Sequence, residues 1–479
     1  MREEEGAELG WRTLLAPRLM LPLSILFGGV LLHSMNVLVT ATLLPSIVGE
    51  LGGASLMSWP TTAFVASSIV AASGTRIASG ALGNRRAFSA GATIYAAGAV
   101  LCAVAPSMAI VVAGRFVQGL GGGMISALAY VFVRNVFPEP LWPRVFGALA
   151  GVWSVTVLAG PLIGGVFASY GHWRGAFAAV AGIGCALGVG ALLTLPADTG
   201  DNLADIPPFP VLRLVLICSA IALLSLASVL TGAALKGGLI GAAIGCFALM
   251  MLIDHRAVAP LLPSDAFSLR SPTGVGLWMV LLMSVGYSPL AVYGPLFLQR
   301  LHGLSPLDAG FIVASASLAW TTAALTVAPL AEEWRPRLIV TGPLAMSVGL
   351  AGMALLMAPG PAAAVLLPIA LVGSGIGAAR AFVLQRVMSG ARDGEDNIAA
   401  ASSATVQQAG IALGAAIAGL VANANGLDSR LDLAAMVRAS VWVPLILAAA
   451  PSAACAIGIR LNQVAQRSEQ RQRIVATSV

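Results

Sequence analysis

Two arginines lie inside long apolar runs, where a positive charge needs water or a polar partner. Arg115 lies in residues 109–127 and Arg380 in residues 373–385, and neither run contains an acidic side chain. If these runs cross a membrane, each guanidinium costs about 2.5 kcal/mol or more unless it faces a wet cavity or a partner. We therefore expect both arginines to line a cavity that favours anionic or neutral ligands and repels lipophilic cations.

Two glutamines and a glycine ladder accompany these arginines. Gln118 follows Arg115 by three residues and therefore lies on the same helical face. Helix carbonyls, Gln118, Gln385 or other neighbours could satisfy the guanidiniums, and Arg115 could instead extend to one membrane surface. Glycines at 119 and 121–123 remove side-chain bulk, so we expect a neighbouring helix to approach closely there.

His33 and Asn36 lie three residues apart on one helical face of the first apolar run. We find no Asp or Glu in the central part of any run. His33 is the only histidine within a run and therefore the one obvious side chain there that could titrate near neutral pH. It is a candidate for proton coupling, with a structural hydrogen-bonding role as the alternative.

Aromatic side chains in the apolar runs could line a roomy hydrophobic cavity. The candidates are Trp59, Tyr130, Trp153, Trp278, Tyr287 and Trp320, together with Met35. Contact with lipid or packing between helices explains these residues equally well.

The composition places the chain in a lipid bilayer. Hydrophobic residues make up 58% of the chain and charged residues 10%, far outside the range of soluble globular proteins. The apolar runs have about the 20 residues that a helix needs to cross the hydrocarbon core, without the two-residue alternation of a barrel. The 5 cysteines have no CxxC or metal-ligand spacing, so we expect no metal and no cofactor. The net charge is +6, but the basic residues are scattered singly along the chain rather than gathered on one face. This distribution argues against nucleic-acid binding.

Breakers and charges divide the chain into fourteen expected spans in a six, two, six pattern. The spans are residues 20–47, 57–77, 88–106, 108–133, 143–169, 175–195, 211–231, 235–253, 273–298, 306–330, 337–358, 361–387, 397–422 and 437–460. Residues 1–196 would form an N-terminal six-helix bundle, residues 197–272 a connector with two additional transmembrane helices, and residues 273–479 a C-terminal six-helix bundle with a cytoplasmic tail. The inserted pair shows no polar chemistry, and we expect it to contact lipid or brace a bundle.

The positions of the basic residues set the expected orientation. Most arginines fall in the loops and tails on the side of the N-terminus, which is the positive-inside pattern and places both termini in the cytoplasm. Arginine supplies all the basic charge except Lys236, which is typical of a GC-rich bacterial gene. The N-terminal segment lacks a cleavage site, so we expect it to be retained. No phosphate-binding GxxxxGK[ST] loop and no nucleophile with a base are found, so we expect neither ATP-driven transport nor an enzyme.

Several segments carry motifs. Residues 115–123, Arg-Phe-Val-Gln-Gly-Leu-Gly-Gly-Gly, match RxxQGxG, and Gly147 with Gly160-Pro161-Leu-Ile-Gly164-Gly165 matches an antiporter motif in which Thr156 replaces a glycine. Further matches are residues 260–263, 293–299, 304–310 and 407–414. With these motifs the chain resembles the major facilitator superfamily, and within it the fourteen-span drug:proton antiporter branch of multidrug exporters. The resemblance covers nearly the whole chain and implies an all-α polytopic membrane protein with two six-helix bundles and two inserted helices.

The motif around Pro161 also has a physical interpretation of its own. Proline inside a helix removes a backbone hydrogen bond and permits a kink, and the glycines at 160, 164 and 165 allow close helix contact. This combination suits a helix that bends or rocks during transport. A tightly packed kinked helix with no moving role is the alternative.

The chain departs from the family at two aspartate positions. Asn36 stands where the branch has a membrane-embedded aspartate, and asparagine cannot titrate. Gly80 stands where the loop motif GxLaDrxGrrR has an aspartate that helps to hold the cytoplasmic side closed. Gly83, Arg85 and Arg86 keep the glycine and the basic pair of that motif, either as part of a gate or as inside-positive anchors.

The resemblance implies a secondary transporter in the bacterial inner membrane that exports hydrophobic or amphipathic small molecules as a monomer by alternating access. Its other partners would be membrane lipids and, where coupling exists, protons. The alternatives are a transporter of anionic or lipid-like metabolites without proton coupling, an importer or facilitator, which the antiporter motif disfavours, and a membrane sensor or scaffold that no longer transports. The residues expected to line the cavity are Asn36, Arg115, Gln118, Tyr130, Trp153, Tyr287 and Arg380.

Overall fold

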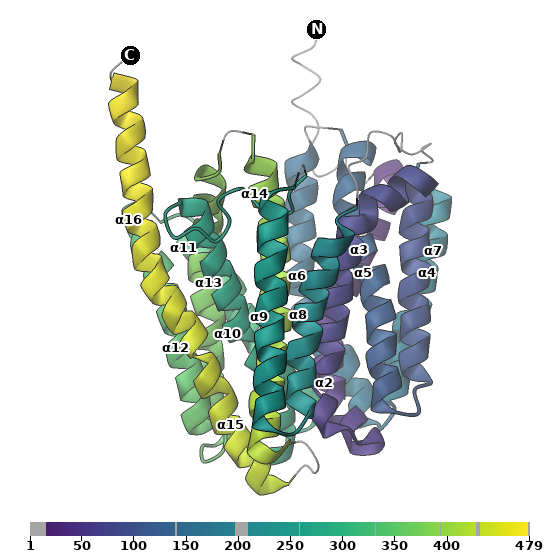
Figure 1. Cartoon of the computed structure of the whole chain (residues 1–479). Helices are drawn as coiled ribbons and strands as arrows, with labels where there is room; N and C mark the ends of the chain where they lie inside the picture. Colours follow the sequence, from purple (N-terminus) through teal and green to yellow (C-terminus); the bar gives the residue numbers. More distant parts are fainter. Residues whose placement is uncertain are drawn as a thin grey trace. The chain divides into compact units, whose positions relative to one another are not determined.

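The computed structural model describes residues 16–138, 141–196, 209–257, 259–330, 332–392, 394–427 and 432–477, and within these ranges every regular element is a helix (Figure 1). The first six long helices are α2 (Pro17–Leu51), α3 (Trp59–Leu82), α4 (Asn84–Ala103), α5 (Met108–Val136), α6 (Trp142–Ser169) and α7 (Trp173–Thr194). The inserted pair is α8 (Val211–Val229) and α9 (Ala233–His255). The remaining long helices are α10 (Pro272–Leu301), α11 (Pro306–Val327), α12 (Arg335–Leu356), α13 (Leu366–Ser389), α14 (Asp396–Ala422), α15 (Leu433–Leu447) and α16 (Ala449–Thr477).

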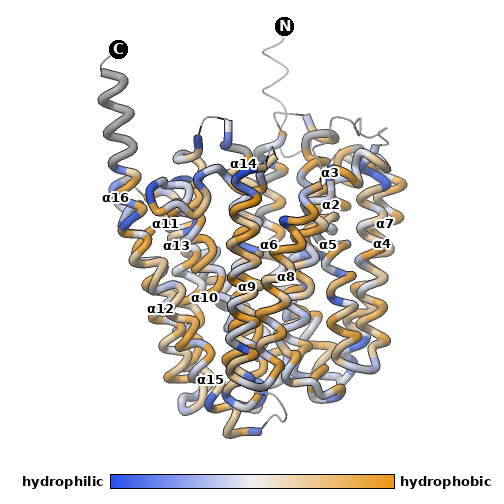
Figure 2. Tube along the Cα trace, in the orientation of Figure 1, coloured by the Kyte–Doolittle hydropathy of each residue, from blue (hydrophilic) through white to orange (hydrophobic). Residues whose placement is uncertain are grey.

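The helices are long and apolar enough to span a membrane. Among the described residues, 12 stretches meet that requirement by length and composition, and Figure 2 shows apolar residues running along the helices. α3 and α6 coincide with expected spans but lie outside these 12. Serines and threonines recur along α3 and lower its hydropathy, and several side chains of α6 lie outside the described part of the chain. The all-helical, membrane-spanning class is confirmed, while the count of fourteen spans stays a prediction.

The chain divides into two compact units. The first unit consists of residues 1–52 and 63–210, and the second of residues 53–62 and 211–479. The segment 53–62, which contains the short helix η1 (Ala54–Leu56) between α2 and α3, therefore belongs to the second unit. The inserted helices α8 and α9 belong to it as well. The predicted boundaries at 196 and 272 stay a prediction.

In the first unit, α5 packs closely against its neighbours along the glycine ladder. A Cβ atom at Gly119 would lie 2.2 Å from the carbonyl oxygen of Phe64 in α3. A Cβ atom at Gly121 would lie 2.3 Å from the backbone nitrogen of Tyr95 in α4. Only hydrogen fits at these positions, so the predicted close approach of helices to this ladder is confirmed.

In the second unit, the inserted pair packs against α14 through apolar side chains. Ala220 and Leu224 of α8 and Ala243 of α9 form a buried cluster with Ala416 of α14. Helices α8 and α9 consist mostly of apolar residues, and one face of the pair therefore packs against α14.

The inserted pair also carries a buried ion pair, so the expectation that it has no polar chemistry is wrong. Arg213 in α8 is 8% exposed and Asp254 at the end of α9 is 2% exposed, and their Nη1 and Oδ1 atoms lie 2.5 Å apart. Asp254 also accepts hydrogen bonds from the backbone nitrogens of Leu261 and Leu262, each at 2.9 Å. The sequence did not reveal this pair because its members are 41 residues apart.

Candidate functional site

Arg115 is the centre of a buried polar cluster in the first unit. It lies in α5 and is 1% exposed. Its Nη1 donates hydrogen bonds to Oδ1 of Asn36 in α2 and to Oε1 of Gln118, the latter at 2.6 Å. Its Cζ atom lies 4.2 Å from the centroid of the Phe64 ring in α3. Gln118 therefore lies on the same face of α5 as Arg115, as their spacing in the sequence predicts.

The carboxamide of Asn36 is held in place by hydroxyl groups. Its Nδ2 donates to the hydroxyl of Tyr95 in α4, which donates in turn to the carbonyl oxygen of Leu32 at 3.1 Å. Thr40, one turn along α2, donates to Asn36 Oδ1 at 3.0 Å. Tyr95 was not among the site residues predicted from the sequence. Its position as a single tyrosine within an otherwise apolar run was the available signal.

No carboxylate pairs with Arg115 in the part of the chain that the structure describes, where the ion pairs are Arg174–Glu50 and Arg213–Asp254. A buried charge without a partner is expensive, and a hydrogen bond to a charged group contributes about 1.5–3 kcal/mol. The carboxamide oxygens therefore stabilise the guanidinium in place of a counter-ion. Arg115 makes almost no contact with solvent here, and its predicted role in lining a cavity stays a prediction.

His33 packs beside this cluster. Its ring stacks on Phe64 with centroids 5.4 Å apart and an interplanar angle of 29°. Its Nδ1 atom is buried without a hydrogen-bond partner among the described residues, and a Cβ atom at Gly122 would lie 2.8 Å from it. The imidazole thus occupies space opened by the glycine ladder. Its predicted role in proton coupling is not tested by this arrangement.

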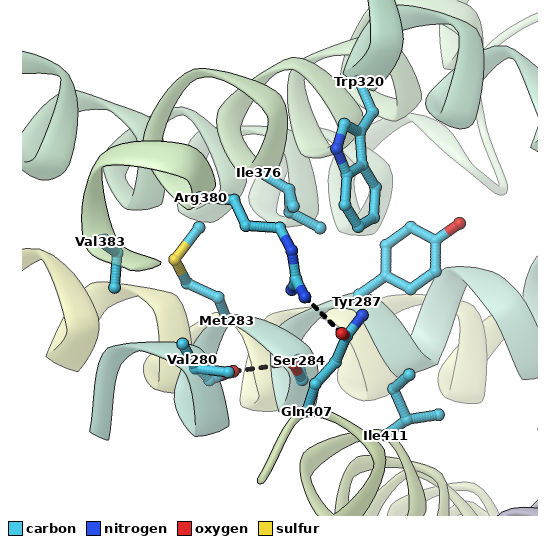
Figure 3. Close-up of a pocket in the computed structure, with 10 residues that line it drawn as sticks. All are labelled: Val280, Met283, Ser284, Tyr287, Trp320, Ile376, Arg380, Val383, Gln407 and Ile411. Carbon is cyan, nitrogen blue, oxygen red and sulfur yellow. Dashed lines mark hydrogen bonds between the residues drawn. The ribbon is translucent and has the colours of Figure 1, made fainter. Parts of the chain in front are cut away.

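Arg380 is the centre of a second polar site, which lies in the second unit and borders a pocket (Figure 3). Its Nη2 donates a hydrogen bond to Oε1 of Gln407 in α14. Its Cζ atom lies 5.7 Å from the centroid of the Trp320 ring in α11. Trp320 meets the ring of Tyr287 from α10 edge to face, with centroids 6.2 Å apart. Gln385, the partner considered from the sequence, is exposed, and the observed partner is Gln407.

The pocket beside Arg380 is narrow and mostly apolar. Apart from Arg380 and Gln407, it is lined by Val280, Met283, Ser284, Tyr287, Trp320, Ile376, Val383 and Ile411. Its empty volume is about 370 Å³ including the part open to solvent, but it has room for only about one or two water molecules. A larger ligand therefore requires the pocket to widen.

The two arginines have corresponding surroundings. Arg115 lies on the fourth helix of the first six, and Arg380 on the fourth helix that follows the inserted pair. Each guanidinium lies near an aromatic ring from the second helix of its own half, Phe64 or Trp320, and each donates to a carboxamide oxygen. The arrangements differ in access, because Arg115 is buried and Arg380 is half-buried.

The predicted gating residues of the loop before α4 have defined positions. Gly83 precedes α4 with φ 76° and ψ 153°, a left-handed conformation that favours glycine. Arg85 Nη1 donates to the carbonyl oxygen of Leu192 in α7 at 3.4 Å, and Arg86 is exposed. These positions fit an anchoring role, and a gating role stays a prediction.

The predicted flexing segment of α6 packs on α2. The helix continues through Pro161. A Cβ atom at Gly160 would lie 2.6 Å from Cβ of Leu38, and one at Gly164 would lie 2.9 Å from the carbonyl oxygen of Val39. Gly165 is buried. The close contact is present, and movement of this helix stays a prediction.

Tyr130 and Trp153 are the two other predicted cavity residues. Tyr130 of α5 is 44% exposed and does not border the pocket beside Arg380. The side chain of Trp153 lies outside the described residues. A cavity role for both stays a prediction.

The helical architecture and the family comparison agree. Residues 26–415 match the model of the Major Facilitator Superfamily. The chain therefore belongs to the major facilitator superfamily, and this membership makes it a transporter rather than an enzyme. The crystal structure of the nucleoside transporter NupG has the same fold, with a TM-score of 0.66 at 12% identity over 92% of this chain and 99% of that one.

Two relatives are similar over most of the chain. A Mycobacterium tuberculosis protein named as a probable multidrug-efflux transporter is 33% identical over 434 residues, which cover 88% of this chain and 91% of that protein. The tetracenomycin C resistance and export protein of Streptomyces glaucescens is 26% identical over 426 residues, which cover 86% of this chain and 76% of that protein.

Proposed function

We propose that this protein exports hydrophobic or amphipathic small molecules across a bacterial inner membrane. The observation that carries this proposal is the 33% identity, over 88% of the chain, to a protein named as a probable multidrug-efflux transporter. We further propose fourteen membrane spans, cytoplasmic termini and a monomer that works by alternating access, as in the drug:proton antiporter branch that the motifs resemble.

The pocket beside Arg380 supports a ligand with a large apolar part. Trp320 and Tyr287 offer flat aromatic surfaces, and Met283 and Ile376 offer apolar walls. Methionine side chains are flexible and adapt to ligands of different shape. Walls of this kind with a few polar groups are typical of small-molecule sites. The pocket would have to widen when a ligand enters, which an alternating carrier can provide.

The coupling of export to protons would not depend on the position of the family's embedded aspartate. Asn36 occupies that position. Its carboxamide accepts a hydrogen bond from Arg115 but does not titrate. His33 contacts the same Phe64 ring as Arg115, so a proton on its imidazole would add a second positive charge there. We therefore propose an exporter in which neither Asn36 nor His33 carries the coupled proton.

Dye accumulation in bacteria that lack their own exporters tests this function. The cells receive the neutral dye Nile red or the cationic dye ethidium, with wild-type protein, a Trp320→Ala variant or an empty vector. Wild-type protein should lower Nile red accumulation, and Trp320→Ala should return it toward the level of the empty vector. The control is Trp442→Ala, because Trp442 is 47% exposed on α15 and lies outside the pocket. Equal Nile red levels with wild-type protein and empty vector, at matched membrane abundance, would contradict export.

A further inference from the structure

Arg380 has an uncompensated positive charge beside the pocket of the second unit. Neither of the ion pairs in the described residues includes it. Its described hydrogen bond goes to the neutral oxygen of Gln407. A guanidinium carries five N–H donors in a planar fork, so this bond leaves donors for a ligand. Arg380 is half-buried and lines the pocket, which brings those donors within reach of a bound molecule.

Gln407 adds donor character to the same place. Its Oε1 accepts from Arg380, so its amide N–H groups face away from the guanidinium and lie on the Tyr287 side of the pocket (Figure 3). The guanidinium and the amide therefore present hydrogen-bond donors together. Two neighbouring sets of donors, one of them cationic, suit a planar oxyanion such as a carboxylate.

The aromatic side chains around these donors favour a ligand with an aromatic ring system. Trp320 and Tyr287 meet edge to face at an interplanar angle of 83°. Trp320 also lies near the guanidinium, which places aromatic surface and positive charge side by side (Figure 3). A ligand that joins a carboxylate to an aromatic ring system would meet both features at once.

The corresponding arginine of the first unit does not offer this site. Arg115 is 1% exposed, and two carboxamide oxygens accept from its Nη1. A ligand would have to displace those bonds to reach it. A bound anion could therefore reach the guanidinium of Arg380 but not that of Arg115.

We propose that the Arg380 pocket selects amphipathic aromatic carboxylates, with Arg380 and Gln407 binding the carboxylate and Trp320 and Tyr287 contacting the rings. This inference rests on the proposed export function and narrows its substrate class. A cationic analogue of the same shape meets repulsion from Arg380, and a neutral analogue keeps only the apolar contacts.

Binding of three probes with one aromatic body tests the inference. The probes are pyrene-1-carboxylate, its neutral methyl ester and the cation 1-aminomethylpyrene, measured by fluorescence on purified protein in a detergent without anionic lipid. Wild-type protein should bind the carboxylate about 10- to 100-fold more tightly than the ester, the ratio expected for hydrogen bonds to a charged group. The Arg380→Gln variant should lose this preference and bind the ester within about twofold of wild type.

Two further variants sharpen the test. Gln407→Glu places a carboxylate against Arg380, so it should weaken pyrene-1-carboxylate binding about tenfold or more and favour the cation. Arg300→Gln is the matched control, because it removes an exposed arginine from α10, the helix that carries Tyr287, outside the pocket. It should keep the wild-type preference.

The outcomes separate this inference from the export proposal. A carboxylate preference that survives Arg380→Gln overturns the inference, and so does wild-type protein that binds the carboxylate no better than the ester. Export of Nile red with either of these results leaves the export proposal standing. Arg380-dependent binding of the carboxylate with no export of any probe supports the pocket and contradicts export.

Discussion

Arg115 donates a hydrogen bond to Asn36, so a buried guanidinium is held by a neutral carboxamide rather than by a carboxylate. The same carboxamide donates to Tyr95 and accepts from Thr40. Asn36 therefore joins α2, α4 and α5 at one point, and it fixes the position of the positive charge without titrating.

Replacing Asn36 by alanine should destabilise the protein. The change removes one acceptor of Arg115 and leaves the hydroxyl of Tyr95 with one partner fewer, at a cost of about 1.5–3 kcal/mol for the lost hydrogen bond to a charged group. Thermal unfolding of the purified protein in detergent should show a lower Tm. Asn36→Asp keeps an acceptor for Arg115 and should retain the wild-type Tm. A Tm for Asn36→Ala equal to that of wild type would contradict the structural role.

Replacing His33 should leave any response to a pH gradient unchanged. The imidazole stacks on the Phe64 ring that Arg115 also contacts, so a proton on it would add a second positive charge there. Flux through His33→Asn in proteoliposomes, with and without a pH gradient, should show the same ratio as flux through wild-type protein. A ratio that falls to one in the variant only would assign proton coupling to His33.

The two ion pairs of the described chain should differ in their contribution to stability. Arg213 and Asp254 have side chains that are 10% and 3% exposed, whereas those of Arg174 and Glu50 are 38% and 49% exposed. Asp254→Asn leaves a buried guanidinium with a weaker partner and should cost up to about 3–5 kcal/mol. Glu50→Gln should cost about 0–1 kcal/mol, because water solvates its partner. Equal losses in chemical unfolding experiments would show that burial does not govern these pairs.

Asn423 should hold the segment 53–62 to the second unit. Its Nδ2 donates to the carbonyl oxygen of Ser55 in η1 and to that of Ser228 in α8, both at 2.9 Å. Asn423→Ala removes both bonds, so hydrogen exchange of residues 53–62 should become faster. The matched control is Asn425→Ala, because Asn425 donates only within its own helical segment, to Val421 at 2.8 Å. Exchange of residues 53–62 that is the same in both variants would exclude this role for Asn423.

The sequence predicts those features that depend on periodicity and composition. Apolar runs interrupted by charges and breakers indicated the helices, and the glycine ladder after Gln118 indicated the close packing of α5. The Arg115–Gln118 contact also followed from a local spacing of three residues. Each of these features is determined within a single helix or at its ends.

The remaining features depend on contacts between distant segments. Gln407 rather than Gln385 meets Arg380, because α14 packs beside α13 in the pocket while Gln385 faces outward. Arg213 pairs with Asp254 only after α8 and α9 fold back on each other. No periodicity within one helix identifies such partners, so the polar contacts between different helices in both sites required the structure.

The rate of Nile red efflux from preloaded cells tests the central claim most directly. De-energised cells that lack other exporters are loaded with the dye, and its fluorescence is followed after energy is restored. Cells with wild-type protein should lose the dye faster than cells with an empty vector, and cells with Trp320→Ala should resemble the empty vector. Identical efflux rates in cells with wild-type protein and with an empty vector, with the protein present in the membrane, would contradict export by this chain.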